Sequence, residues 1–171
     1  MILMRHPPVA AKGLCYGRLD PGLAPGWEPP LDGHLPALAQ IPAIHASPSP
    51  RARTPARRLA AALGAPLILD ARLQELDFGR WEGRAWNALP RPELDLWAED
   101  PERRAPPGGE TFAALAARVA AALADAPDGA LILAHAGPIR ALLMRARGLD
   151  FRAAFADPVP YADPFPLGGP R

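Results

Sequence analysis

Two histidines of this sequence each end a short apolar run, an arrangement that could do chemistry. His6 ends the run MILMRH, and His135 ends the run ALILAH. If both runs are buried strands of a parallel sheet, their carboxyl ends lie at one edge, where ligands of such sheets bind. We therefore expect the two imidazoles to meet at that edge. An imidazole can attack phosphorus and carry the phosphoryl group.

Three further side chains, at expected strand ends and turns, would complete a phosphoryl-transfer site. Arg5 and Arg51 offer planar guanidinium donors that suit phosphate oxygens, and Glu75 could protonate a leaving oxygen. A helix that begins just after His135 would add backbone N–H groups. Because positive side chains neutralise the phosphoryl oxygens in such a site, we expect no metal ion and no other cofactor. Cys15 is the only cysteine, which excludes an internal disulfide and a cysteine-based zinc cluster.

Length and charge set the broad class of the protein. The 171 residues are enough for one domain, which we expect to span residues 1–171. The formal net charge of +1 favours neither a nucleic acid nor an acidic membrane as partner. No apolar run approaches the roughly 18 residues of a membrane span, and the start lacks a signal-peptide pattern. We expect a cytoplasmic protein that binds a small phosphorylated substrate, and an apolar edge near the C-terminal tail would allow a homodimer.

Apolar runs and breaks predict strands that alternate with helices. We expect strands at residues 1–6, 41–46, 66–69 and 130–135, and helices at residues 51–63, 111–126 and 139–147. Pro42 suggests that the second strand is imperfect or lies at a sheet edge. The alternation is typical of an α/β fold with a mainly parallel sheet.

The remaining stretches are rich in proline and glycine. Residues 10–36 read as a long loop that lines the site, and residues 70–83 also read as a loop. Residues 86–99 have helical character interrupted by two prolines. Beyond Asp150 we expect extended chain, with one late strand around residues 159–161 and a loose tail over residues 156–171.

Five motifs in order resemble the histidine phosphatase superfamily, also called phosphoglycerate-mutase-like. They are LMRH, SPSPRART, LQELDFGRWEG, PPGGETF and LILAHAGPIRALL, and they run from residue 2 to about residue 149. The resemblance implies a three-layer sandwich with a mainly parallel central sheet flanked by helices. It also implies a phosphatase that forms a phosphohistidine intermediate.

The same resemblance implies a role for each site residue. His6 would be the nucleophile, and Glu75 the general acid that later activates water. Arg5, Arg51 and His135 would bind the phosphoryl oxygens. The stretch GLCYGRLDPGL resembles the α-ribazole phosphatase branch, which removes a phosphate late in cobalamin nucleotide-loop assembly. On that basis the substrate-binding set also includes Ala136, Tyr16, Gly17 and Arg18.

One departure from the family pattern follows the first histidine. The family usually reads Arg-His-Gly-Glu/Gln-Thr, whereas Pro7-Pro8-Val9 follow His6 here. Pro7 keeps its carbonyl but has no N–H, so an acceptor for the imidazole remains and a donor is lost. The missing threonine hydroxyl removes a secondary phosphate contact.

Several alternatives remain open at this point. A mutase-type isomerase could use the same site, and a non-catalytic phosphate-binding module could keep the same fold. Asp77 and Glu82 rival Glu75 as the acid. Cys15 could be an inert loop thiol or line the pocket, while His45 and Trp81 read as ordinary structural residues.

Overall fold

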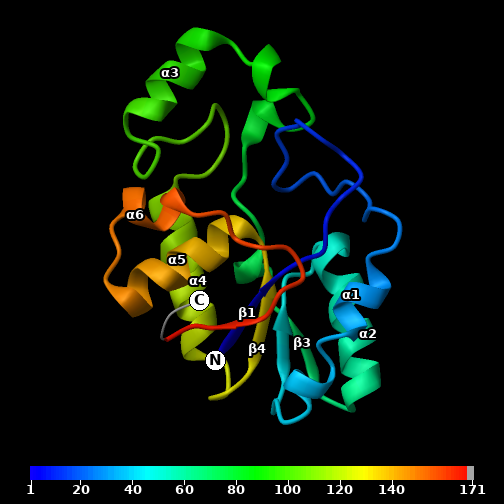
Figure 1. The fold of residues 1–171 in the computed structure, drawn as a ribbon. Helices are drawn as coiled ribbons and strands as arrows, with labels where there is room; N and C mark the ends of the chain where they lie inside the picture. Colours follow the sequence, from blue (N-terminus) through cyan, green and yellow to red (C-terminus); the bar gives the residue numbers. More distant parts are fainter. Residues whose placement is uncertain (169–171) are drawn as a thin grey trace.

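The computed structural model describes residues 1–168 and places five strands in one sheet between layers of helices (Figure 1). The strands are β1 (Ile2–Arg5), β2 (Ile44–Ala46), β3 (Leu67–Leu69), β4 (Leu131–Ala134) and β5 (Phe165–Pro166). Their order is β3-β2-β4-β1-β5, and only the pairing of β5 with β1 is antiparallel within this sheet. The expected three-layer α/β sandwich with a mainly parallel sheet is confirmed.

Helices cover both faces of the sheet. The α-helices are α1 (Glu28–Asp32), α2 (Pro50–Leu63), α3 (Arg91–Glu99), α4 (Phe112–Ala124), α5 (Ala136–Arg147) and α6 (Phe151–Ala156). Short 3₁₀ helices are η1 (Pro36–Leu38), η2 (Ala71–Leu73), η3 (Gly79–Trp81) and η4 (Trp86–Ala88). Helices α1 and α2 lie on one face, α4 and α5 lie on the other, and α3 stands above the carboxyl ends of the strands (Figure 1).

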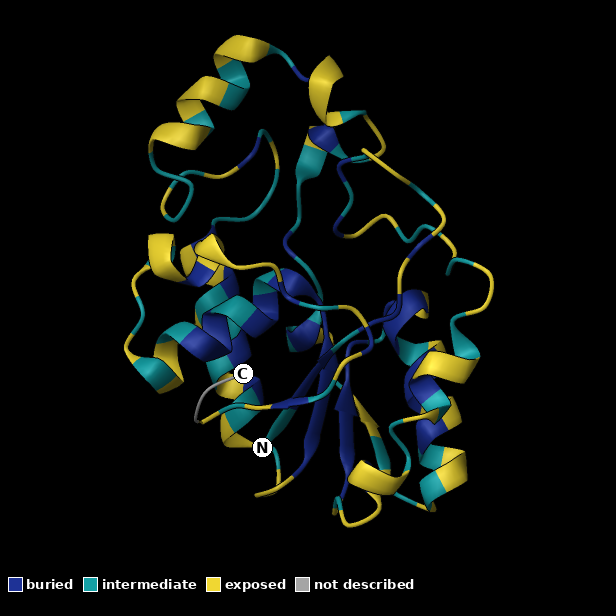
Figure 2. Ribbon diagram, in the orientation of Figure 1, coloured by how far each residue is buried: buried dark blue, intermediate teal, exposed yellow. Residues whose placement is uncertain are grey.

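Two apolar clusters, one on each face, explain why the central strands are mostly apolar. Leu3 packs with the cluster of α4 and α5, while the next residue, Met4, packs with the cluster of α2. Both side chains are fully buried, as expected for a strand covered on both faces. The central strands are accordingly buried, whereas α3 is largely exposed (Figure 2).

Local sequence accounts for the helix ends. Pro50 occupies the first turn of α2, where its missing N–H costs nothing, and Gly64 ends the helix with φ +63°. The Thr111 hydroxyl caps α4 by accepting a hydrogen bond from the N–H of Ala114 at 3.1 Å. Helix α5 begins at Ala136 rather than at residue 139 as expected, because Pro138 is tolerated in a first turn.

The second strand does not lie at the sheet edge, which was one of the two possibilities that Pro42 suggested. β2 begins at Ile44 and lies between β3 and β4. Pro42 precedes the strand and therefore removes no hydrogen bond from the sheet. Within the expected loop at residues 10–36 the chain also forms α1, and the interrupted stretch at residues 86–99 forms η4 and α3.

The C-terminal segment differs most from expectation. Residues 151–156 form α6, because the Asp150 carboxylate caps it by accepting from the N–H of Ala153 at 2.7 Å. The late strand is β5 at residues 165–166, not at residues 159–161. The prediction of a loose tail is wrong for the described part, since Val159, Ala162 and Phe165 are buried. Residues 169–171 lie outside the described residues.

Candidate active site

The two histidines meet at the carboxyl edge of the sheet. β1 and β4 are parallel neighbours in which Arg5 pairs with Ala134, so the next residues, His6 and His135, lie side by side. Their ring centroids are 5.1 Å apart at an interplanar angle of 62°. Relative exposure is 1% for His6 and 0% for His135. Two histidines far apart in the chain thus lie next to each other in the buried part of the site.

The hydrogen bond of His6 selects its tautomer. Nδ1 lies 2.7 Å from the Pro7 carbonyl oxygen, which can only accept, so Nδ1 donates and Nε2 keeps its lone pair. Burial lowers the pKa of His6 from 6.5 to about 3, with further lowering by the charges of Arg51 and Arg5 against an opposite effect of the Pro7 bond. His6 is therefore neutral at ordinary pH, as a nucleophile must be.

His135 is held by a serine that sequence reasoning missed. Its Nε2 lies 2.8 Å from Oγ of Ser47, which is fully buried and directly follows β2 at the same sheet edge. Its Nδ1 is buried without a partner among residues 1–168. Burial lowers the pKa of His135 well below 6.5, and the neighbouring His6 adds to this effect. Ser47 directly follows the apolar run at residues 41–46, and this position could have identified it as a site residue.

Arg5 is held by the C-terminal segment. Its Nη1 donates to the Val159 carbonyl at 3.0 Å, and its Nη2 donates to the Tyr161 hydroxyl at 2.8 Å. The guanidinium carbon lies 3.6 Å from the centre of the Tyr161 ring, a cation–π contact. The Tyr161 ring also lies 5.6 Å from that of His6, between centroids.

Arg51 is fixed by the loop that carries Gly17 and Asp20. Its Nη1 contacts Asp20 Oδ1 at 2.7 Å and the Leu19 carbonyl at 3.0 Å, and its Nη2 donates to the Gly17 carbonyl at 2.7 Å. The backbone N–H of Arg51 also donates to the Asp20 carboxylate. Asp20 therefore both pairs with a fully buried guanidinium and caps α2.

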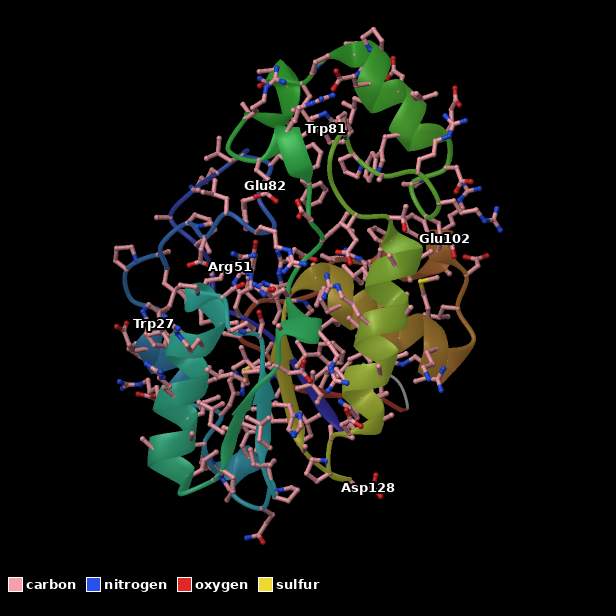
Figure 3. All side chains as sticks on the ribbon, turned by 180° about the vertical axis from the view of Figure 1, so that it is seen from behind. Trp27, Arg51, Trp81, Glu82, Glu102 and Asp128 are labelled. Carbon is pink, nitrogen blue, oxygen red and sulfur yellow. The ribbon has the colours of Figure 1, made fainter. Side chains whose placement is uncertain are left out.

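Glu82 holds the same loop from the other side. Its carboxylate accepts hydrogen bonds from four backbone N–H groups at 2.7–3.0 Å; they belong to Gly17, Arg18, Leu19 and Phe78. Figure 3 labels Glu82 and Arg51, on either side of this loop. Because its oxygens are already occupied, Glu82 reads as a structural anchor rather than as the acid.

Glu75 lines the cavity next to His6. Its two carboxylate oxygens lie 3.1 and 3.2 Å from the N–H of Gly137, at the start of α5, and Oε1 also accepts from the N–H of Leu76. A Cβ at Gly137 would collide with Oε1, so the glycine permits this approach. The expected helix N-terminus is present, but this N–H serves Glu75. Asp77 instead accepts from the N–H of Gly79.

A cavity of about 320 Å³ opens beside these residues. Tyr16 and Ala136 are among the described residues that line it, whereas Gly17 and Arg18 are not. Gly17 contributes its carbonyl to Arg51, and the side chain of Arg18 bonds to Gln74. Burial, together with Tyr161, raises the pKa of Tyr16 to about 12, so its hydroxyl stays protonated.

The other residues considered in the sequence analysis, Cys15, Trp81 and His45, are all buried in the protein. Cys15 is buried beside Trp81, and burial, with the charge of Glu82, raises the pKa of its thiol to about 12. Trp81 is fully buried and donates to Glu93 at 3.0 Å. His45 is buried, and neither ring nitrogen has a partner within residues 1–168.

Within the described part of the chain, no three His, Cys, Asp or Glu side chains are grouped as a metal site. No helix in residues 1–168 is both long and apolar enough to cross a membrane.

Comparison with known sequences decides the family. The profile described as "Histidine phosphatase superfamily (branch 1)" matches residues 1–163. The chain belongs to the histidine phosphatase superfamily. As a member of this superfamily it is a phosphatase-type enzyme.

Curated relatives of this histidine phosphatase carry different names. A protein provisionally named phosphoserine phosphatase 2, from Hydrogenobacter thermophilus, is 29% identical over 150 residues, which cover 81% of this chain and 72% of the relative. A relative from Mycobacterium tuberculosis, which is named only as a bifunctional protein, is 35% identical over 84% of this chain. The chain spans 43% of the length of that mycobacterial relative.

Solved structures of similar shape include phosphatases. A mycobacterial glucosyl-3-phosphoglycerate phosphatase in complex with VO₃ has a TM-score of 0.78 at 27% identity, over 96% of this chain and 90% of that chain. The alpha-ribazole phosphatase of Shigella flexneri has a TM-score of 0.83 at 23% identity, over 95% and 87%. At that identity the second likeness concerns the fold alone.

Proposed function

We propose that this chain is a metal-independent phosphomonoesterase that acts through a phosphohistidine at His6. One observation carries the proposal: two buried imidazoles lie in contact, and the bond of Nδ1 to the Pro7 carbonyl leaves the lone pair of Nε2 on His6. Around them, Arg5 Nε, Arg51 Nε and His135 Nδ1 are buried without partners among the described residues. Unpaired buried donors are costly, and the oxygens of a phosphoryl group would satisfy them.

The proposed reaction has two steps. In the first, Nε2 of His6 attacks phosphorus, the ester P–O bond breaks, and Glu75 in its acid form protonates the leaving oxygen. In the second, Glu75 as carboxylate takes a proton from water, whose oxygen attacks phosphorus and breaks the P–N bond. Inorganic phosphate leaves, and His6 and Glu75 return to their starting forms. Arg5, Arg51 and His135 stabilise the phosphoryl oxygens throughout.

The substrate that we propose is a small phosphorylated metabolite. The resemblance of residues 13–23 to the α-ribazole phosphatase branch makes α-ribazole 5′-phosphate the first compound to test. The names of the relatives add phosphoserine and glucosyl-3-phosphoglycerate to the same screen.

The central test is the His6→Ala variant, assayed with 4-nitrophenyl phosphate in the presence of a chelator. We expect a loss of about a thousandfold or more, because the covalent route is removed. His34→Ala, which changes a histidine outside the site, is the matched control and should keep full activity. Unchanged turnover by His6→Ala would exclude the proposal.

A second measurement looks for the intermediate directly. Rapid quenching of the wild type with labelled substrate in alkaline detergent should trap label on His6. Tight binding without any label would favour a phosphate-binding module, and interconverted phosphoglycerates without free phosphate would favour a mutase.

A further inference from the structure

Aromatic side chains gather on one wall of the cavity beside His6. Of the five Phe and four Trp residues in the sequence, six line this cavity. We call them the aromatic wall; they are Phe78, Trp86, Trp97, Phe112, Phe151 and Phe155. They come from η4, α3, α4, α6 and the turn before η3, all of which lie above or beside the carboxyl edge of the sheet.

Four of these rings pack in or against the apolar core clusters, whereas Trp86 and Phe155 do not. Trp86 is 36% exposed and Phe155 is 40% exposed, although apolar core residues elsewhere are almost fully buried. Trp86 stands edge-on to Phe78 at 5.5 Å, and Phe155 stacks on Phe151 at 4.2 Å, both between ring centroids. Phe155 is covered by Phe151 and by the guanidinium of Arg140, whereas the partly exposed ring of Trp86 offers a surface on which a ligand can pack.

Three charged side chains, Arg5, Glu75 and Arg140, are among the described residues that line the cavity. Apart from Arg5, the cation that lines the cavity within residues 1–168 is Arg140. Its guanidinium donates to the carbonyls of Ala154 and Asp157 at 3.1 and 3.2 Å. It also lies 4.5 Å from the centre of the Phe155 ring. Arg140 thus joins α5 to α6 and to the residue after it, and it also lines the cavity.

We infer that the substrates are phosphate monoesters whose leaving alcohol carries a planar aromatic ring that packs on the aromatic wall. This inference rests on the proposed function and names the substrate class for the same site. The phosphoryl group binds at His6, and the ring lies towards η4 and α6. Monoesters of small acids, such as 3-phosphoglycerate and phosphoserine, are then poor substrates.

The kinetic test compares 2-phenylethyl phosphate with ethyl phosphate. Both release a primary alcohol, so their chemical reactivity is similar and the ring is the main difference. We expect kcat/KM to favour the phenyl compound by about ten- to a hundredfold, the effect of burying one ring face. Equal kcat/KM values would overturn the inference while leaving the phosphatase proposal intact.

Two variants connect this preference with the wall. Trp86→Ala and Phe155→Ala should each reduce the phenyl preference, which is the ratio of the two kcat/KM values, several-fold. Both rings are partly exposed, so the variants should fold. Leu96→Ala, at an exposed apolar residue of α3 that does not line the cavity, is the control. An unaltered preference in both wall variants would also overturn the inference.

A binding measurement separates the two proposals. (3-Phenylpropyl)phosphonate and propylphosphonate replace the ester oxygen with CH₂ and cannot be hydrolysed. Calorimetry should give a Kd for the phenyl compound about tenfold lower or more. If this preference is present but no monoester is hydrolysed, the proposed function fails and the ring site stands. If hydrolysis occurs and the two phosphonates bind equally, the ring site fails.

Discussion

The aromatic wall and the group formed by Arg5, His6, Arg51 and His135, here the histidine–arginine cluster, are built in opposite ways. Cluster residues end or follow strands or open α2; His6, Arg51 and His135 are buried, and each of the four makes at least one side-chain hydrogen bond. Wall residues come from short helices and turns around the sheet, and two of their rings are substantially exposed. The difference teaches that the sheet positions the groups proposed for chemistry, while the peripheral helices present the surface proposed for the leaving group.

The sharpest way to separate chemistry from selectivity is Glu75→Gln. The amide keeps an acceptor for the N–H of Gly137 but cannot donate a proton as an acid. We expect kcat/KM for 2-phenylethyl phosphate to fall about 100- to 10,000-fold. The loss should be smaller with 4-nitrophenyl phosphate, because nitrophenolate leaves without protonation. Equal losses for both substrates would contradict the role of Glu75, and the ring preference should not change.

The two buried histidines of the cluster should make the folded protein less stable in acid. In the folded protein the pKa of His6 is lowered from 6.5 to about 3, and that of His135 is also lowered. Between these pH values the unfolded chain binds more protons than the folded chain. The free energy of unfolding should therefore decrease as pH falls through this window, by up to about 1.4 kcal/mol per pH unit for each histidine.

Urea unfolding between pH 7 and pH 5 measures this slope. His45, which is buried with a lowered pKa, adds to it in every variant. A His6→Gln/His135→Gln double variant should therefore have a shallower slope than the wild type. Identical slopes would show that the two imidazoles do not carry the pH dependence.

The Glu82→Gln substitution should loosen the loop that carries Gly17 and Asp20. The substitution removes the charge that accepts four backbone N–H groups, so stability should fall by about 1.5–3 kcal/mol, the range for hydrogen bonds to a charged group. Because this loop positions Arg51, kcat/KM should fall for ring-bearing and small substrates alike. Urea unfolding and the substrate pair measure both effects; Glu28→Gln, at α1, is the control.

Tyr161→Phe should have the smallest effect. It removes the hydroxyl that accepts from Arg5 but keeps the ring over the guanidinium. Loss of one such bond is worth about 1 kcal/mol, which corresponds to roughly a fivefold fall in kcat/KM. The ring preference should be unaffected. A change in preference without a fall in turnover would place Tyr161 in the wall instead.

Elements with an uninterrupted pattern could be predicted from the sequence. β1 and β4 were found because each is an apolar run that ends at a histidine, and α4 because its apolar residues recur at helical spacing. Helix α6 and strand β5 were missed because six and two residues are too short to show a period. An edge position was suggested for β2 because a proline before a strand reads like a proline within it.

The site shows the same division. His6, His135 and Glu75 could be located from motifs that lie beside regular elements. The partners of the two arginines could not be located. Asp20 reaches Arg51, and Tyr161 reaches Arg5, only because loops fold back over the sheet edge. No local pattern encodes such a path. The acceptor for the His6 imidazole could be predicted, because Pro7 keeps its carbonyl. This carbonyl accepts the hydrogen bond from Nδ1 of His6.

The position of β1 has a consequence for how the protein forms in the cell. Its neighbours in the sheet are β4, where Ile2 pairs with Leu131, and β5, where Leu3 pairs with Phe165. Strand β1 is therefore synthesised well before either of its partner strands. Such distant pairing slows folding and leaves an apolar segment unprotected meanwhile. A nascent chain halted before α6 would lack β5, so one edge of β1 would stay without a partner strand.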